Sequence, residues 1–227
     1  MTADIRDLPL PDAVIFDLDG TLVDTVQTRI DAWSETFEEA GIPTTREALA
    51  PLIGVDGKRL AREVAARAGQ PIDDERAEEI DKRSGEIYER RNHYPKPLPG
   101  VRELVDAIES TGPRWSIATS SRKDQVGTSV KALGLDDEPN IVDASHVEHA
   151  KPEPDLLLRA AEELNVAPGK AWYIGDSTWD MVAAVAAGMI PIGVTAGAAV
   201  DDRALIGAGA AAVVETLNEV ADALRNG

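Results

Sequence analysis

The 227-residue sequence contains no cysteine. Disulfide bonds, metal sites built from thiolates and cysteine nucleophiles are therefore excluded. A chain that does without disulfides suits the cytoplasm. The amino terminus also lacks the basic segment and apolar run of a signal peptide. From these features we expect a cytoplasmic protein.

Positive charge is scarce in this sequence. Lysine and arginine total 23 residues against 41 aspartates and glutamates, which gives a formal net charge of -18. A chain this acidic is repelled by nucleic acid and by anionic membrane surfaces, and it attracts cations. We therefore expect no nucleic-acid partner.

Long hydrophobic runs are also few. One uncharged stretch, residues 181–200, has the length of a membrane span, but several glycines and Pro191 interrupt it. A helix, a turn and a short buried strand explain this stretch better than a membrane helix does. We expect no membrane partner, and a monomer or a homodimer.

Short apolar runs alternate with helical patterns along most of the chain, and the hydrophobic content of 43% is ample for a packed core. The predicted strands are 13–16, 115–118, 141–142, 171–174 and 190–194. The predicted helices between them are 101–110, 123–133, 154–164 and 178–187. This alternation predicts an α/β fold with a parallel sheet covered on both faces. Because Pro191 has no N–H group to donate, we expect the fifth strand towards an edge of the sheet.

One interval breaks the alternation. From residue 25 to about 92 only helical patterns occur, at 26–40, 46–53, 58–68 and 74–91. The following segment, 93–100, holds three prolines and is typical of a linker. The sequence therefore predicts an α/β core of residues 1–24 and 94–227 with an inserted all-helical cap domain of residues 25–93. Near the carboxyl end, 207–214 is small and apolar, and a last helix is expected from Glu215.

Polar residues follow three of the predicted strands. They are 17–21 (DLDGT), 119–121 (TSS) and 175–177 (GDS). In open parallel sheets, ligands bind beyond the carboxyl ends of the strands. Each segment also has a simple structural interpretation: Asp19 and Gly20 could form a turn, and Thr119 and Asp176 could cap helices. Their combination is better explained by one shared site.

Residues 14–25 (VIFDLDGTLVDT) closely resemble the first motif of the haloacid dehalogenase superfamily. Thr119 looks like its second motif, 151–154 (KPEP) like the third and 175–180 (GDSTWD) like the fourth. The four motifs occur in the family's order and span most of the chain. The resemblance implies a Rossmann-like parallel sheet in strand order 5-4-1-2-3 with a mobile cap. The helical insert is similar to the subtype whose cap follows the first strand.

The resemblance also implies roles for individual residues. Asp17 would attack phosphorus and form an aspartyl-phosphate, and Asp19 would be the general acid and base. Lys151 would pair with the nucleophile and with the transferring phosphoryl group, whose oxygens Thr119 would bind. The expected phosphate-binding set is completed by Gly20, Ser120 and Ser121.

The same resemblance implies a bound magnesium ion. Two carboxylates about 4 Å apart repel by about 4 kcal/mol at an effective dielectric of about 20, and a divalent cation removes this cost. Mg²⁺ suits carboxylate, carbonyl and water oxygens. The family pattern gives Asp17, the Asp19 carbonyl and Asp176 as ligands. Asp180, four residues after Asp176 and expected on the same helical face, would be a direct ligand or would support one.

The type of reaction depends on Asp19. An alkoxide that leaves phosphorus needs a proton, whereas a halide does not, so an acid at this position favours phosphate esters. The resemblance thus implies a magnesium-dependent phosphatase that acts on a small phosphorylated metabolite. Two alternatives stay open: a sugar phosphomutase similar to β-phosphoglucomutase, and a non-catalytic phosphate-binding regulatory module.

Two cap residues are candidates for substrate selectivity. Lys58 and Arg59 fall in the first turn of a helix expected to be capped by Asp56. Cations there oppose the helix dipole, at a cost of about 0.3–1 kcal/mol each. One interpretation is ordinary surface charge. The other is that Lys58 or Arg59 holds an anionic group of the substrate when the cap closes.

Overall fold

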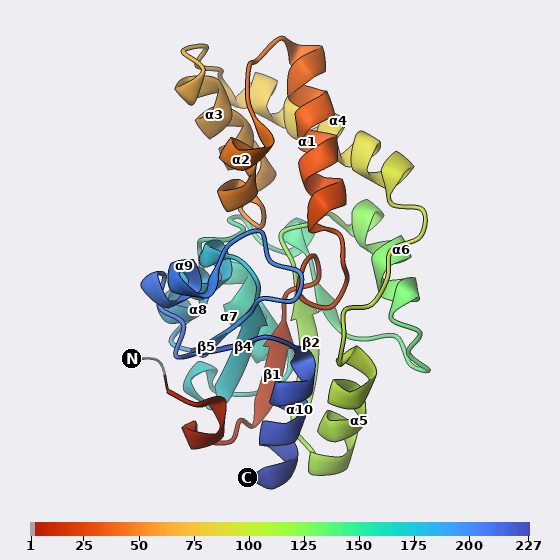
Figure 1. Cartoon of the computed structure of the whole chain (residues 1–227), viewed down its shortest axis with the longest axis vertical. Helices are drawn as coiled ribbons and strands as arrows, with labels where there is room; N and C mark the ends of the chain where they lie inside the picture. Colours follow the sequence, from red (N-terminus) through yellow and green to blue (C-terminus); the bar gives the residue numbers. More distant parts are fainter. Residues whose placement is uncertain (1–2) are drawn as a thin grey trace.

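A parallel sheet of six strands forms the centre of the computed structural model, which describes residues 3–227 (Figure 1). The strands are β1 (Ala13–Phe16), β2 (Arg114–Ala118), β3 (Ile141–Val142), β4 (Ala171–Gly175), β5 (Ile190–Val194) and β6 (Ala212–Val214). They lie in the order β3-β2-β1-β4-β5-β6, and all neighbouring pairs are parallel. β1 and β4 are buried along their whole length, as central strands covered on both faces should be.

Helices cover both faces of this sheet. They are α5 (Val101–Thr111), α6 (Lys123–Ala132), α7 (Asp155–Glu163), α8 (Thr178–Ala187), α9 (Asp202–Gly207) and α10 (Leu217–Asn226). Successive side chains of β1 point to opposite faces. Val14 and Phe16 pack in one cluster with α5 and α10, whereas Ala13 and Ile15 pack in another with α7 and α8. The core therefore has three layers, helix, sheet and helix.

The predicted α/β fold is confirmed. Read from β5 to β3, the strand order is 5-4-1-2-3, as the family resemblance implied, and β6 is added beyond β5. The five predicted strands are present, and β2 and β4 are each one residue longer than predicted. β6 was expected only as a small apolar segment, because three residues are too few to show the period of a strand.

The expectation that Pro191 marks an edge is wrong. β5 lies between β4 and β6, and Pro191 pairs with Tyr173 of β4. The ladder between β5 and β6 begins at Ile192, one residue later. The Pro191 carbonyl accepts a hydrogen bond from the N–H of Ala211, just before β6. The missing N–H of the proline therefore falls where β6 has not yet begun, so no ladder hydrogen bond is lost.

Four helices between β1 and β2 form the inserted segment, which we call the cap. They are α1 (Val26–Ala40), α2 (Arg46–Leu49), α3 (Gly57–Arg67) and α4 (Asp74–Arg91). They pack around an apolar cluster of their own at one end of the molecule (Figure 1), in which Trp33 stacks on Phe37. The helix predicted over 46–53 is divided into α2 and the 3-10 turn η2 (Ala50–Leu52), where Pro51 cannot supply an N–H group to continue α2.

The two chain connections between cap and core run side by side. The N–H of Asp24 donates to the carbonyl of Lys96, and the N–H of Leu98 donates to that of Leu22, each at 2.9 Å. The predicted domain boundaries, after residues 24 and 93, lie in or next to these connections. That they separate two bodies able to move relative to each other stays a prediction.

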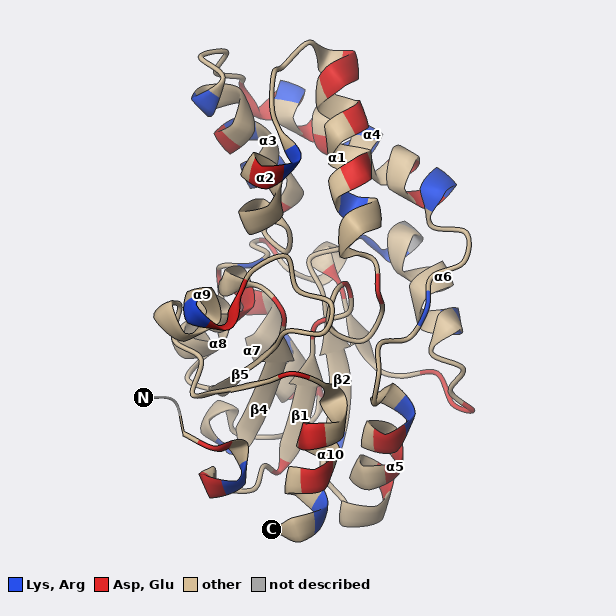
Figure 2. Cartoon of the chain, in the orientation of Figure 1, with Lys and Arg blue, Asp and Glu red and all other residues tan. Residues whose placement is uncertain are grey.

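The uncharged stretch 181–200 folds as predicted, into the end of α8, a turn at Gly188 and the strand β5. Within residues 3–227, no helix is both long enough and apolar enough to cross a membrane. Acidic residues are spread over both parts of the molecule, from α1 in the cap to α5 and α10 in the core (Figure 2).

Candidate active site

Three neighbouring strands bring polar side chains to one edge of the sheet. Asp17 and Asp19 follow β1, Thr119 follows β2, and Asp176 follows β4. Because β2, β1 and β4 are parallel neighbours, their carboxyl ends meet. The N–H of Asp17 still donates to the carbonyl of Ile174 at 2.9 Å, so the sheet fixes its backbone. The predicted gathering of these residues is therefore observed.

Lys151 is completely buried at the centre of this edge. Its Nζ lies 2.6 Å from Asp17 Oδ1, 2.8 Å from Asp180 Oδ1 and 3.1 Å from the Tyr173 hydroxyl. Burial alone would lower the pKa of Lys151, but the Asp17 and Asp180 carboxylates outweigh burial and hold this pKa well above its usual value. Lys151 is therefore a fixed positive charge against one side of Asp17.

Asp17, Asp176 and Asp180 form a buried acidic cluster, in which one carboxylate oxygen of each lies within 4.8 Å of the others. Burial raises the pKa of Asp17 to about 7, although Lys151 opposes the rise. Burial and the charges of Asp180 and Asp17 raise the pKa of Asp176 well above its usual value. A cation at this cluster would relieve the repulsion between the ionised carboxylates.

The cluster fits a hard divalent cation such as Mg²⁺, because its donors are carboxylate oxygens. Gly20 has a φ of +85°, and a Cβ at this position would collide with the Asp176 carboxylate. Glycine therefore leaves space for that carboxylate. The N–H of Gly20 already donates to the Val23 carbonyl at 2.8 Å, so it is not free to bind phosphate in this conformation.

Both carboxylate oxygens of Asp180 accept hydrogen bonds from other protein groups. Oδ1 contacts Lys151 and Tyr173, and Oδ2 accepts hydrogen bonds from the N–H (3.0 Å) and the hydroxyl (2.6 Å) of Ser177. Asp180 is thus placed to orient Lys151. The expectation that Asp176 and Asp180 share a helical face is wrong, because α8 begins at Thr178 and Ser177 is its N-cap.

The Asp19 side chain points away from the acidic cluster and towards the cap. Its Oδ2 accepts hydrogen bonds from Arg29 (2.8 Å) and Ser121 (2.7 Å), and its Oδ1 accepts from Thr25 (2.7 Å) and Tyr88 (2.9 Å). Burial disfavours the charged form, but Arg29 and the hydroxyl donors outweigh it and lower the pKa of Asp19 to about 2. In this conformation Asp19 is therefore ionised, and each of its oxygens accepts two hydrogen bonds.

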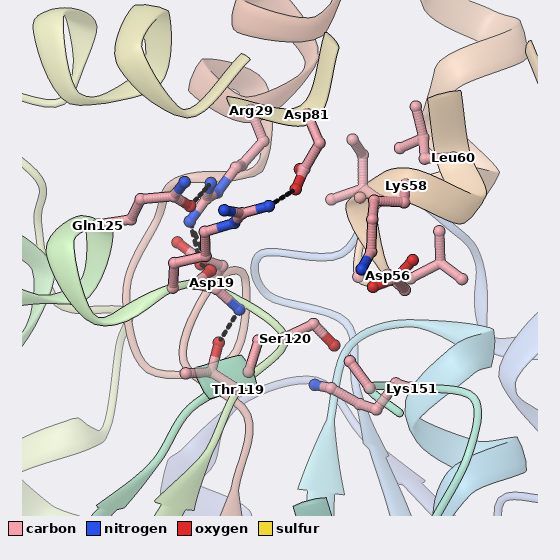
Figure 3. Close-up of a pocket in the computed structure, with 18 of the residues that line it drawn as sticks. Asp19, Arg29, Asp56, Lys58, Leu60, Asp81, Thr119, Ser120, Gln125 and Lys151 are labelled. Carbon is pink, nitrogen blue, oxygen red and sulfur yellow. Dashed lines mark hydrogen bonds and ion pairs between the residues drawn. The ribbon is translucent and has the colours of Figure 1, made fainter. Parts of the chain in front are cut away.

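The turn after β2 supplies hydroxyl groups to the cavity that Lys151 also lines (Figure 3). The hydroxyl oxygen of buried Thr119 accepts a hydrogen bond from the N–H of Ser121 at 3.1 Å, which orders the turn. The Ser120 hydroxyl oxygen is buried and has no hydrogen-bond partner in the part of the chain that the structure describes. A ligand oxygen would satisfy it. Thr119 does not cap α6, whose N-cap is Arg122.

The cap is docked on the core in this structure. The N–H of Asp56 donates to the carbonyl of Lys151 at 2.9 Å. On α8, the indole N–H of Trp179 donates to the carbonyl of Pro51 at 2.8 Å. A cavity of about 700 Å³ lies between cap and core, and Asp17 lines its core side. This volume is enough for a small organic phosphate.

The two cap residues predicted to contact substrate lie in different places. Lys58 lines the cavity, with its Nζ 3.7 Å from a carboxylate oxygen of Glu78. Arg59 is exposed and does not line the cavity; its guanidinium carbon lies 5.4 Å from the centre of the Trp179 ring. The predicted cap of α3 is confirmed, because the Asp56 side chain accepts a hydrogen bond from the N–H of Arg59 at 2.9 Å.

Three residues of the site were missed by sequence reasoning. Arg29 and Tyr88 contact Asp19 from α1 and α4, and nothing in their helical patterns distinguishes them from surface or core residues. Tyr173 lies in a fully buried strand. A buried tyrosine hydroxyl needs a partner, so a tyrosine in an otherwise apolar strand was a usable signal.

Comparison with known proteins agrees with this geometry. Residues 14–194 match the family model described as haloacid dehalogenase-like hydrolase. A phosphorylated carbohydrates phosphatase of Thermotoga maritima is 31% identical over 94% of this chain and 100% of its own length. A β-phosphoglucomutase of Bacillus subtilis is 30% identical over 82% of this chain and 84% of its own.

A solved structure, a hydrolase from Pseudomonas syringae, superposes with a TM-score of 0.88 and is 34% identical, covering 94% of this chain and 97% of the other. The matched region runs from β1 to β5 and includes every motif on which the resemblance was based. The resemblance is therefore confirmed, and the chain belongs to the family of haloacid dehalogenase-like hydrolases.

Proposed function

We propose that this chain is a magnesium-dependent phosphatase that hydrolyses a small phosphorylated metabolite through a phosphoryl intermediate on Asp17. The observation that carries the proposal is the buried pair of Asp17 and Lys151 at the end of β1, with Asp176 beside it. This arrangement joins a carboxylate nucleophile, a fixed cation and donors for a metal ion. The phosphatase named among the relatives supports the same chemistry.

The reaction divides into two displacements at phosphorus. Phosphate monoesters hydrolyse so slowly unaided that an enzyme must lower the barrier by on the order of 20 kcal/mol. In the first step an Asp17 oxygen attacks phosphorus, and the bond to the ester oxygen breaks as Asp19 gives that oxygen a proton. In the second, Asp19 takes a proton from water, which attacks the phosphorus and releases phosphate and free Asp17.

The contacts of Asp19 couple this acid–base group to the cap. Arg29 and Tyr88 are two of its four hydrogen-bond partners and belong to the cap, whereas Ser121 belongs to the core. The conformation described here, with Asp19 ionised, suits the second step. Because Ser121 is engaged by Asp19, its role in our proposal is to orient Asp19, and phosphate binding falls to its neighbours.

The remaining residues of the site bind the metal ion and the phosphoryl group. Asp17, the Asp19 carbonyl and Asp176 would hold Mg²⁺, which supplies neutralisation of the negative charge on the carboxylates and the phosphoryl oxygens. Lys151 compensates the charge on Asp17 and on the phosphoryl group. Thr119 and the unpartnered hydroxyl of Ser120 bind phosphoryl oxygens.

The proposal is tested with 4-nitrophenyl phosphate, whose hydrolysis is followed by absorbance, in Mg²⁺ and in excess EDTA. We expect turnover in Mg²⁺ and its loss in EDTA. Undiminished activity in EDTA would contradict the magnesium site. If purified protein with Mg²⁺ hydrolyses neither this ester nor a panel of phosphorylated metabolites, the non-catalytic phosphate-binding module becomes the better hypothesis.

A sugar phosphomutase is the second candidate, and it is favoured by the similarity to a β-phosphoglucomutase. The two activities separate in one experiment, incubation with a hexose 1-phosphate followed by phosphorus NMR. We expect free phosphate. Catalytic accumulation of the 6-phosphate isomer, primed by a bisphosphate, would favour the mutase.

The proposal places the enzyme in the cytoplasm, in agreement with a chain that needs no disulfide. A monomer or a homodimer is expected, and sedimentation analysis distinguishes the two.

A further inference from the structure

Charged residues of both cap and core line the side of the cavity that lies opposite Lys151, the partner of Asp17. Lys58 comes from α3, Glu78 and Asp81 come from α4, and Arg122 follows the turn after β2. Figure 3 shows Lys58 and Asp81 on the cap side of the cavity, opposite Ser120 and Lys151. These groups therefore meet the part of a substrate that is not transferred.

The cations on this side of the cavity are already paired with carboxylates of the cap. Arg122 Nη2 lies 2.7 Å from Glu78 Oε1 and 2.5 Å from Asp81 Oδ2. Lys58 Nζ lies 3.7 Å from the other oxygen of Glu78. Lys123 also lines the cavity, but it is exposed, so water and salt screen its charge. Two carboxylates thus occupy the positions that an anionic substrate group would take beside Arg122 and Lys58.

The position of Asp81 is supported by its surroundings. Its side chain is only 16% exposed. Gly57, the first residue of α3, has no side chain where a Cβ would collide with the Asp81 carboxylate. The fold therefore leaves room for this carboxylate against Arg122.

A second anionic group on the substrate would have to displace these carboxylates or lie beside them. Displacement would leave Glu78 and Asp81 without their cations, and Asp81 is mostly buried. Close approach would add repulsion between like charges in a partly enclosed space. A hydroxyl group faces neither cost, because it can donate a hydrogen bond to a carboxylate that stays paired.

We propose that Glu78 and Asp81 select substrates whose non-transferred part is uncharged and hydroxylated, a phosphorylated polyol or sugar, and discriminate against those with a second phosphate or a carboxylate. This inference rests on the proposed function and narrows its substrate class. It also disfavours a mutase, because a bisphosphate must place its second phosphate on this side of the cavity. The apolar side chains of Trp33 and Leu60, which also line the cavity, provide a surface for the carbon skeleton.

The test uses two ligands of nearly equal size. In 6-phosphogluconate a carboxylate replaces the terminal hydroxymethyl group of sorbitol 6-phosphate. The inhibition constant of each is measured against hydrolysis of 4-nitrophenyl phosphate in Mg²⁺, so that neither ligand needs to be a good substrate. We expect the wild-type protein to bind sorbitol 6-phosphate about tenfold more tightly, a preference that salt weakens because the charges are partly exposed.

Variants that neutralise one carboxylate at a time test the roles of Glu78 and Asp81. Glu78→Gln and Asp81→Asn should each reduce the preference by about threefold or more, chiefly through tighter binding of 6-phosphogluconate. Glu89→Gln is the matched control, because Glu89 lies on the same helix, is exposed and does not line the cavity. It removes the same charge and should leave the preference unchanged. If Asp81→Asn fails to fold, half-exposed Glu78 still provides the test.

The main competing interpretation is a latch that only holds the cap closed. Loss of a latch would change the binding of both ligands by the same factor, and this result, or equal binding of both by the wild-type protein, would overturn the inference. Failure of the proposed function is distinguishable, because the wild-type protein would then hydrolyse no phosphate ester with Mg²⁺ and no inhibition could be measured.

Discussion

Lys151 shows how closely the charges of the site depend on one another. It is completely buried and bonded to Asp17 and Asp180. Removing one partner of a buried ion pair without a replacement typically costs about 3–5 kcal/mol. Asparagine keeps the shape of aspartate and an acceptor oxygen for Lys151. Substitution of Asp17 by asparagine therefore tests the chemistry with the least structural damage.

We expect Asp17→Asn to lower kcat by at least about 1,000-fold, because an amide oxygen does not replace the carboxylate nucleophile. Near pH 5.5, where Asp17 is still mostly protonated, the free energy of unfolding should change by less than about 1 kcal/mol, because a neutral amide then replaces a neutral carboxyl group. Steady-state kinetics and urea unfolding measure the two effects. A few per cent of wild-type turnover, in protein shown by mass spectrometry to be free of deamidation, would refute the nucleophile.

Arg29 contacts Asp19, the proposed acid that protonates the leaving oxygen. The effect of replacing Arg29 should therefore depend on how much the leaving group needs a proton. Arg29→Met removes a charged partner of Asp19 and should lower kcat on an alkyl phosphate by about tenfold or more. A 4-nitrophenolate leaves without a proton, so its release should be affected less. Tyr88→Phe, which removes only one hydroxyl donor, should have a smaller effect in the same direction. Equal losses on both esters would mean that Arg29 supports the cap without orienting Asp19.

At the level of residues, the sequence predicted those that follow a strand and missed those that reach the site from elsewhere. Asp17, Thr119 and Asp176 could be placed because parallel strands end at one edge. The partners of Asp19 could not, since Arg29 contacts it only once α1 packs over the core. Arg59 lies outside the cavity for a related reason: the sequence predicts the turn of a helix, whereas packing of the folded chain decides which side chain of that turn faces the cavity.

Trp179 joins two elements, α8 of the core and the turn that follows α2 in the cap. Trp179→Phe removes the hydrogen bond to the Pro51 carbonyl and keeps an aromatic ring beside Arg59. We expect a loss of about threefold to tenfold in kcat/KM, because one hydrogen bond contributes about 0.5–1.5 kcal/mol to docking. The loss should be the same for sorbitol 6-phosphate and 6-phosphogluconate. A change in the preference between them would place selectivity at this contact too.

The elements themselves were largely predictable, because apolar runs and helical periods are properties of local sequence. The cap helices over 26–40 and 74–91 have the predicted bounds. β6 and α9 were missed because each is very short, and the place of β5 inside the sheet was missed because it depends on β6. The order of the strands came from the family resemblance, since no local pattern specifies which strands are neighbours.

The molecule as a whole carries a formal charge of -18, and acidic residues occur on both cap and core (Figure 2). Such a charge attracts divalent cations to the surface in general. A specific site is distinguished by its effect on stability, because a bound ion stabilises the folded state in proportion to the logarithm of its concentration over its dissociation constant. The buried cluster of Asp17, Asp176 and Asp180 makes this effect depend on pH.

In the absence of metal, burial raises the pKa of Asp17 to about 7 from an ordinary value of 3.8. A carboxyl group whose pKa is raised by folding contributes stability that is present below its unfolded pKa and is lost as the pH rises through its folded pKa. The melting temperature in EDTA should therefore fall between about pH 5 and pH 8. The Asp17→Asn variant lacks the titrating group, so its melting temperature should fall less over this pH range.

Magnesium should reverse this trend, because it binds the ionised carboxylates. At ten times its dissociation constant an ion stabilises the folded state by roughly 1.4 kcal/mol, which raises the melting temperature of a protein of this size by about 3–5 °C. We expect this increase near pH 8 and a much smaller one near pH 5.5, where protons compete for Asp17 and Asp176. Thermal unfolding in Mg²⁺ and in EDTA across this range measures the difference. An equal increase at both pH values, or one that persists in Asp176→Asn, would assign the stabilisation to surface charge and contradict a magnesium site at the end of β1.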